Sequence, residues 1–298
     1  MIRQSCIATL AYFDLFQYPL TLVEVYRYLY WLGNVGDDEL SVVTLDTVRD
    51  VLHDPAIGER DGYYFLKGSE PSVALRHSRY RLAQKKMRRA KWFAWCAARL
   101  RSVRLVAVCN NLAFCNARKE SDIDLFIIVE PGALWTARFC ITSVLTLFRL
   151  RPTRQKSADQ LCASFWITSA AMDVSSLALP DGDPYLLFWI ATLRPLYDAG
   201  GYADAFFAAN MWVKKRLPFA WGAQSSHIAV LSQAPFFSFI ERILRRFQER
   251  LLPARVRLLA NRDSRVRVSN DILKFHTNDR RQHYATQFTQ RLRKYHSA

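Results

Sequence analysis

Two aspartates that alternate with apolar residues are the part of the sequence best suited to chemistry. Asp122 and Asp124 are interleaved with Ile123 and Leu125, and the apolar run that continues to Val129 predicts a strand. Side chains at positions i and i+2 of a strand point to the same side, so we expect the two carboxylates to converge. Such a pair repels itself unless a cation neutralises it, and oxygen ligands favour Mg²⁺ held together with substrate phosphates. The less specific interpretation is two exposed acids at the end of a strand.

The residues before this pair complete a recognisable pattern. Residues 105–108 predict a buried strand, Asn110 and Asn111 follow it, and ten residues separate Asn111 from Asp122. This arrangement resembles the signature of the DNA polymerase β-type nucleotidyltransferase superfamily. In that signature a strand leads to a Gly-Ser pair that opens a helix, and Asp-x-Asp between apolar residues follows after a short loop.

The resemblance implies a Mg²⁺-dependent transfer of a nucleotidyl group from a nucleoside triphosphate to a hydroxyl acceptor. It makes Asp122 and Asp124 the catalytic and metal-binding residues. The nucleotide would be bound by polar and basic residues of the same segment, namely Asn110, Asn111, Arg118, Lys119 and Ser121. For Arg118 and Lys119, an exposed loop surface without a role in binding is an equally good interpretation.

Two departures from the signature put catalysis in question. Asn110 and Asn111 stand where the family has Gly-Ser; asparagine reaches positive φ more readily than most residues, but its side chain adds bulk where a phosphate would lie. The family's third carboxylate, often a base, belongs to a later strand, and residues 163–168 contain no acid. Asp159 and Asp173 flank that strand on expected loops. The alternative function is therefore a catalytically degraded nucleotidyltransferase domain that binds nucleotide, nucleic acid or protein as a regulator.

The elements around this segment predict an α+β protein. We expect a winged-helix-like domain over residues 1–70, because three helices precede a hairpin at Asp61-Gly62. Its third helix begins at Thr44 and is acidic, which would repel DNA phosphates, so packing or partner docking is the better interpretation. More widely, the order of winged helix, basic helix, nucleotidyltransferase domain and helical tail resembles a group of bacterial nucleotidyltransferase-domain proteins.

The rest of the chain divides by composition. Residues 71–104 predict a basic connecting helix, solvated in its first half and buried from Trp92 onward. Residues 105–230 predict a nucleotidyltransferase-like mixed sheet flanked by helices, and residues 231–298 predict a basic helical tail. The expected helices after the first two strands cover residues 134–150, 184–196, 202–212, 236–252 and 279–295.

The charge distribution points to a polyanionic partner. The formal net charge is +16, and residues 71–104 hold 11 basic residues and no acidic one. We expect residues 72–101 and 236–298 to hold RNA or another polyanion. The alternative is that these basic segments pair with the acidic residues 1–70.

The cysteines and the apolar segments bear on the compartment. None of the six cysteines forms a CxxC pair, which predicts buried thiols in a reducing, cytoplasmic environment. The longest apolar stretch, residues 134–150, is interrupted by Arg138, so we expect a buried helix and no membrane association.

Overall fold

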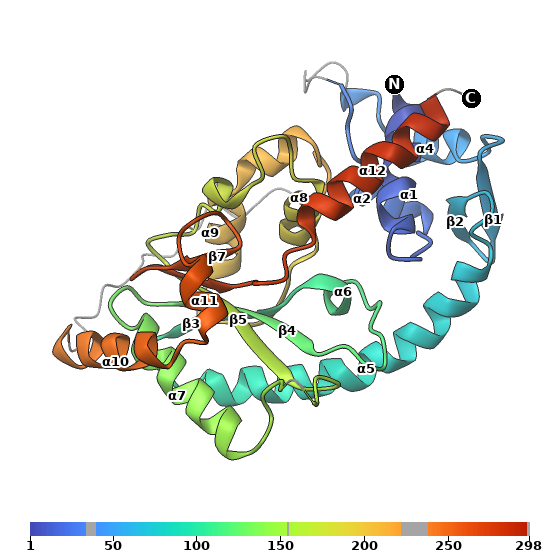
Figure 1. The fold of residues 1–298 in the computed structure, drawn as a ribbon. Coiled ribbons are helices and arrows are strands. Elements are labelled where there is room, and N and C mark those ends of the chain that lie inside the picture. Colours follow the sequence, from blue (N-terminus) through green and yellow to red (C-terminus); the bar gives the residue numbers. More distant parts are fainter. Residues whose placement is uncertain (34–39, 154, 222–237, 297–298) are drawn as a thin grey trace.

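A mixed six-stranded sheet forms the centre of the protein in a computed structural model, which describes residues 1–33, 40–153, 155–221 and 238–296 (Figure 1). The strand order is β6-β3-β4-β5-β8-β7. Only β4 and β5 are parallel, and all the other neighbours are antiparallel. The strands are β3 (Val103–Val108), β4 (Ile123–Val129), β5 (Leu161–Thr168), β6 (Arg194–Asp198), β7 (Val266–Val268) and β8 (Ile272–Phe275). Together with the helices, this confirms an α+β protein.

Both faces of the sheet are covered, which explains why its central strands are apolar throughout. Phe126 and Ile128 of β4 belong to a cluster with α8 (Pro184–Thr192). Ile127 belongs to a second cluster with α5 (Pro71–Ala97) and α7 (Leu134–Leu147). The helix α7 also supplies the crossover that the parallel pair β4 and β5 requires.

The N-terminal residues form helices and a hairpin in the expected order. The elements are α1 (Ile2–Asp14), α2 (Leu22–Arg27), α4 (Leu45–Val51), β1 (Ile57–Arg60) and β2 (Tyr63–Leu66). The capping box that we expected at Thr21 and Glu24 is present. Asp61 and Gly62 have φ of 54° and 73°, the positive values of a two-residue hairpin turn.

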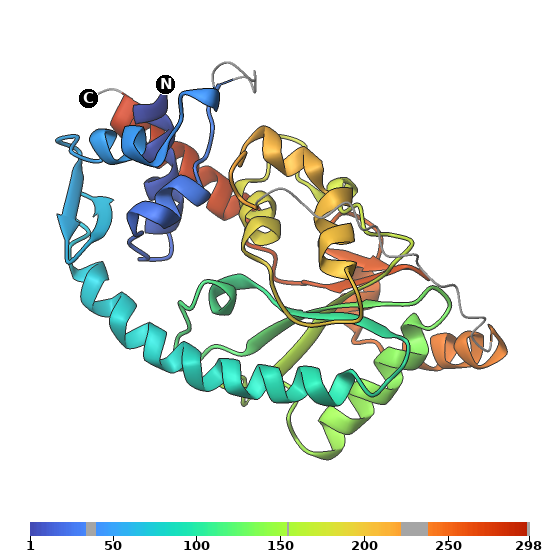
Figure 2. The same ribbon diagram turned by 180° about the vertical axis from the view of Figure 1, so that it is seen from behind.

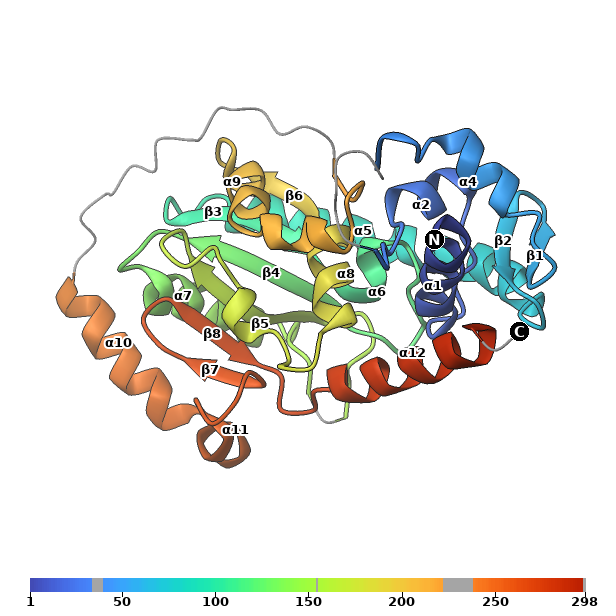
Figure 3. The same ribbon diagram turned by 90° about the horizontal axis from the view of Figure 1, so that it is seen from above.

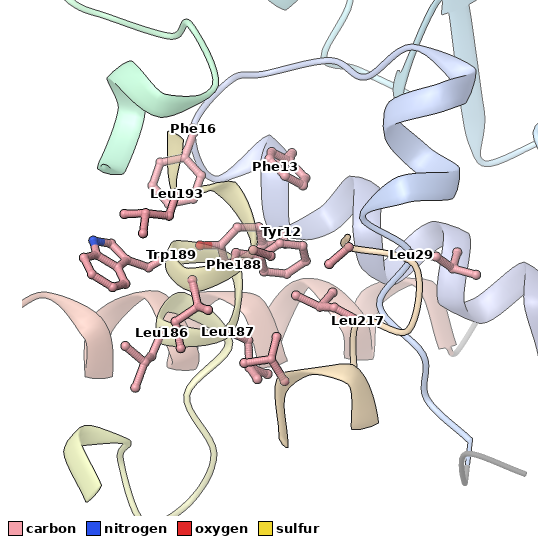
Figure 4. Packing of buried hydrophobic residues seen from close by; sticks show 14 of the residues in the cluster. Tyr12, Phe13, Phe16, Leu29, Leu186, Leu187, Phe188, Trp189, Leu193 and Leu217 are labelled. Carbon is pink, nitrogen blue, oxygen red and sulfur yellow. The ribbon is translucent and has the colours of Figure 1, made fainter. Parts of the chain in front are cut away.

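This N-terminal part shares its core with the rest of the chain. Tyr12 of α1 stacks on Phe188 of α8 with ring centroids 3.8 Å apart (Figure 4). The helix α12 (Arg281–His296) runs from the sheet to α1 (Figure 3). There Arg291 Nε donates to Asp14 Oδ2 at 3.0 Å. Residues 1–70 are therefore held to the sheet by α5 along one path and by α12 along another.

The connecting helix α5 is buried differently from our expectation. Figure 2 shows it running from the hairpin to the sheet, and one side is buried along its whole length. Arg79 and Lys86 in the first half are buried, whereas Trp92 and Trp95 in the second half are 51% and 60% exposed. The division into a solvated and a buried half was wrong, because a helix between two bodies buries a stripe and not an end.

The segment 184–196 and the C-terminal region also differ from the sequence interpretation. The helix that we expected to reach residue 196 ends at Thr192, and β6 follows. Pro195 explains the change, since the residue before a proline is biased toward extended backbone. The C-terminal region is not purely helical: besides α10 (Ser238–Leu251), α11 (Ala254–Leu259) and α12, it contributes β7 and β8 to the sheet. Part of the expected helix 236–252 lies outside the described residues.

Candidate functional site

The two aspartates converge as expected, and a cysteine joins them. Asp122 immediately precedes β4, and Asp124 is its second residue. Cys162 of β5 is the parallel-register partner of Asp124. One carboxylate oxygen of each aspartate and the Cys162 sulfur all lie within 4.8 Å of one another. The cluster sits where β4 and β5 begin, at a sheet position that both strands fix.

The electrostatics of the pair are those of two acids that share a confined space. Burial raises the pKa of Asp124 to about 7, and the neighbouring Asp122 adds to the rise, while a hydrogen bond from Asn110 opposes it. Burial also raises the pKa of Asp122, against a hydrogen bond from Cys162 and the positive charge of Lys86. Burial raises the pKa of the Cys162 thiol, so this group stays protonated and donates to Asp122.

Asn110 connects the aspartates to the helical layer. Its φ of 55° lies in the left-handed region, which asparagine tolerates better than most residues. The Tyr185 hydroxyl of α8 donates to Asn110 Oδ1 at 2.8 Å, and the Cys109 amide donates to the Asp124 carbonyl at 3.2 Å. Asn111 is partly exposed in the same short helix, α6 (Asn110–Ala113), and its carbonyl accepts from the Asn116 amide.

The basic residues before the aspartates lie apart from the pocket beside Asp124. Arg118 and Lys119 are exposed and do not line it. Ser121 Oγ donates back to the Arg118 carbonyl at 2.9 Å. Arg118 and Lys119 therefore form no part of the wall of this pocket.

A residue that sequence reasoning assigned to a solvated helix face positions this loop instead. Lys86 of α5 is 3% exposed. Its ammonium donates to the carbonyls of Lys119 and Ser121 at 3.3 and 2.5 Å and lies 2.8 Å from Asp159 Oδ1. Lys86 therefore holds the segment that leads directly into Asp122.

A pocket of about 360 Å³ adjoins Asp124. Asn110, Asp124 and Cys162 line part of it, and the rest comes mainly from α8 and from the stretch of chain that runs from β8 into the first turn of α12. The residues from this second group include Tyr185, Trp189, Lys274, His276, Arg280 and Tyr284. Our sequence interpretation missed them because they lie far from the Asp-x-Asp motif along the chain.

Two titratable groups of the pocket are shifted by burial. Burial lowers the pKa of His276 to about 3, so the ring is neutral, and its Nε2 lies 3.2 Å from Ser164 Oγ. Burial and the nearby Arg281 lower the pKa of Lys274 to about 8. The rings of Tyr185 and Tyr284 stack with centroids 5.4 Å apart and supply an aromatic wall.

Among the described residues, no third carboxylate joins the two aspartates of the cluster. Asp159 pairs with Lys86, and Asp173 accepts from the Ser175 amide at 2.8 Å. Within the described ranges, β5 carries Cys162 beside Asp124 and no acid anywhere along its length.

The cysteines and the apolar helices bear on two further expectations. All six cysteines are free thiols, and each is buried or partly buried. No helix among the described residues is long and apolar enough to span a membrane. Comparisons of the chain with protein-family models, with curated proteins and with solved structures find no match.

Proposed function

We propose that the protein is a Mg²⁺-dependent nucleotidyltransferase that moves a nucleotidyl group from a nucleoside triphosphate to a hydroxyl acceptor. The observation that carries the proposal is the pair Asp122 and Asp124, whose carboxylates converge beside a pocket of about 360 Å³ with both pKa values raised. Burying two adjacent carboxylates is unfavourable unless a cation joins them. We also propose that residues 1–70, whose helices and hairpin follow the order of a winged helix, form a winged-helix-like domain.

The residues at the site fit a magnesium ion. Asp122 and Asp124 offer carboxylate oxygens, the ligands that Mg²⁺ prefers, and the remaining positions suit phosphate oxygens and water. Cys162 is a poor ligand for Mg²⁺, and its raised pKa keeps it as a hydrogen-bond donor to Asp122. Bound there, Mg²⁺ would neutralise the triphosphate and the charge that develops on it during transfer.

The residues of the chain would mainly position the substrates. The base and sugar would lie against the aromatic wall of Tyr185 and Tyr284, and Lys274 would place a positive charge in the same pocket. In the reaction, an acceptor hydroxyl oxygen bonds to the α-phosphorus, the bond to the bridging oxygen breaks, and pyrophosphate leaves. The hydroxyl proton passes to water, a slower route than transfer to a positioned carboxylate.

A basic and aromatic stripe on α5 supports a polyanionic acceptor such as RNA. Its members are exposed and recur at spacings of three and four residues, which places them on one helix face. They are Arg81, Lys85, Arg88, Trp92 and Trp95, and exposed Arg99 follows just after the helix ends. The Arg99 guanidinium lies 3.2 Å from the centroid of the Trp95 ring. Cations with exposed aromatic rings suit a phosphate backbone with unpaired bases.

A second function, a regulator that binds nucleotide, nucleic acid or protein without turnover, is favoured by one feature. Cys162 occupies the position beside Asp124 on β5 where a third carboxylate would complete the cluster. A thiol with a raised pKa cannot accept a proton as a carboxylate would. Nucleotide binding would survive this substitution, whereas turnover would be slow or absent.

Calorimetric titration of ATP, GTP, CTP and UTP with Mg²⁺ tests the proposal. We expect metal-dependent binding to the wild type and its loss in Asp122→Asn/Asp124→Asn, with Asp173→Asn as a matched control that retains it. Pyrophosphate release in the presence of RNA then distinguishes the enzyme from the regulator. Equal binding by the wild type and the double variant would refute the site.

A further inference from the structure

A buried arginine in the helical layer has no acidic partner among the described residues. Arg138 of α7 is 7% exposed. Its Nη1 donates to Gln248 Oε1 of α10 at 2.5 Å, and its guanidinium carbon lies 5.0 Å from the centroid of the Phe275 ring. Its Nε is buried without a hydrogen-bond partner in the part of the chain that the structure describes. Neither contact supplies a negative charge.

Other buried cations of the protein are better compensated. Arg281 pairs with Asp183 and Asp279 at 2.7 and 2.8 Å. Arg79 pairs with no acid in the described part of the chain, but its guanidinium donates to three oxygen atoms. Burial lowers the pKa of Arg138 to about 10, and the nearby Arg151 contributes, which is the response of a cation without a counter-charge.

Arg138 lines a second pocket, with a volume of about 220 Å³. Arg151 and Thr142 are also at its wall, and most of the remaining lining is apolar, from residues such as Leu145, Leu161 and Val256. None of the residues that line it is an acid. The pocket therefore offers two guanidinium groups and an apolar interior, and it is small for a nucleoside triphosphate.

We propose that this pocket binds a small organic anion, with a carboxylate or phosphate ester against Arg138 and Arg151 and a short apolar remainder along α7, β5 and α11. A guanidinium fork matches both kinds of anion in a bidentate manner, and the ligand would supply the partner that Arg138 lacks. Cys162 and Ser164 line both this pocket and the one beside Asp124, so the two sites adjoin at the first half of β5. The proposal does not depend on nucleotidyl transfer.

Hexanoate and hexyl phosphate are suitable probes for the full-length chain, with hexanol as the uncharged control. We expect at least one of the two anions to bind in calorimetry and to raise the thermal midpoint by about 2 °C at ten times its Kd. The anion that binds more tightly shows whether the pocket prefers a carboxylate or a phosphate ester. Hexanol should neither bind nor raise the thermal midpoint. Failure of both anions to bind the wild type would overturn the proposal.

Variants at Arg138 separate a ligand-binding role from a structural one. Arg138→Met should weaken anion binding by about tenfold or more, and its ligand-free midpoint should equal or exceed that of the wild type. Arg101→Met, at an exposed position, should change neither the anion affinity nor the ligand-free thermal midpoint. If Arg138→Met does not fold, Arg151→Met should still weaken binding. Unchanged affinity in the variants, or binding of hexanol as tight as that of the anions, contradicts the proposal. The variant Asp122→Asn/Asp124→Asn should retain anion binding, so the two sites can be tested separately.

Discussion

Replacing Asp124 by asparagine should stabilise the metal-free protein at alkaline pH. The pKa of Asp124 is raised from 3.8 to about 7 in the folded state. Below pH 3.8 the group is protonated in both the folded and the unfolded chain, so it does not lower the free energy of unfolding there. The cost appears as the pH rises, because the unfolded chain releases the proton first, and it is complete above about 7.

The size of the effect follows from the shift. A difference of about three pKa units corresponds to about 4 kcal/mol at pH 8, at about 1.4 kcal/mol for each unit. The side chain keeps some contact with solvent, which reduces this value to about 2 kcal/mol. About a third of the cost is already present at pH 5, so the advantage of the variant should grow by about 1–3 kcal/mol between pH 5 and pH 8.

Urea unfolding in EDTA at the two pH values measures this difference directly. Asparagine keeps the size of the side chain and an oxygen that can accept from Asn110, so packing should change little. Asp173→Asn, at an exposed acid outside the cluster, is the control for the loss of a carboxylate in itself. Adding Mg²⁺ at pH 8 should stabilise the wild type and leave Asp124→Asn unchanged. A variant that is less stable than the wild type at pH 8, or a difference that is the same at both pH values, would refute the reasoning.

Three further substitutions test the architecture of the site. Lys86→Met should lower the free energy of unfolding by about 2–3 kcal/mol, because two carbonyls and Asp159 lose a charged donor. Urea unfolding measures this loss, with Lys85→Met at an exposed position as the control. A loss equal to that of the control would contradict the role of Lys86. Cys162→Asp should tighten Mg²⁺ binding by about tenfold at pH 8, since a third carboxylate joins the pair, whereas Cys162→Ser should not tighten it. Calorimetric titration with MgCl₂ measures the affinity of each variant. Equal Mg²⁺ affinities of Cys162→Asp and Cys162→Ser would argue against a cation site. Phe188→Ala should lower the free energy of unfolding by about 3–5 kcal/mol, because this side chain is 1% exposed and packs between α1 and the sheet layer. Val144→Ala, at an exposed position, should lower it little. A small loss of stability for Phe188→Ala would mean that the N-terminal part is not anchored there.

The local features of the site could be predicted from the sequence. The alternation of Asp122 and Asp124 with apolar residues specifies a strand with both carboxylates on one side, because the side-chain period of a strand is two. The strand β4, the hairpin turn at Asp61-Gly62 and the capping box at Thr21 were confirmed for the same reason. Each depends on residues that are neighbours along the chain.

Residues whose role depends on distant parts of the chain could not be predicted. Lys86 reads as one more basic residue of an exposed helix face, and only the approach of α5 to the loop before Asp122 turns it into a buried anchor. Cys162 reads as a buried thiol until the parallel register of β4 and β5 places it beside Asp124. The short strands β7 and β8 carry too few residues to reveal a period.

The sequence by itself determined the α+β class, the paired aspartates and the free thiols, because composition and short-range periodicity encode them. Only the tertiary structure decided which cations are buried, which side chains line the two pockets, and how α12 joins the sheet to α1. Those outcomes depend on the packing of elements that are far apart in the sequence. The free energy of burying a charge such as that of Arg138 or Lys86 is set by the partners that such packing brings to it.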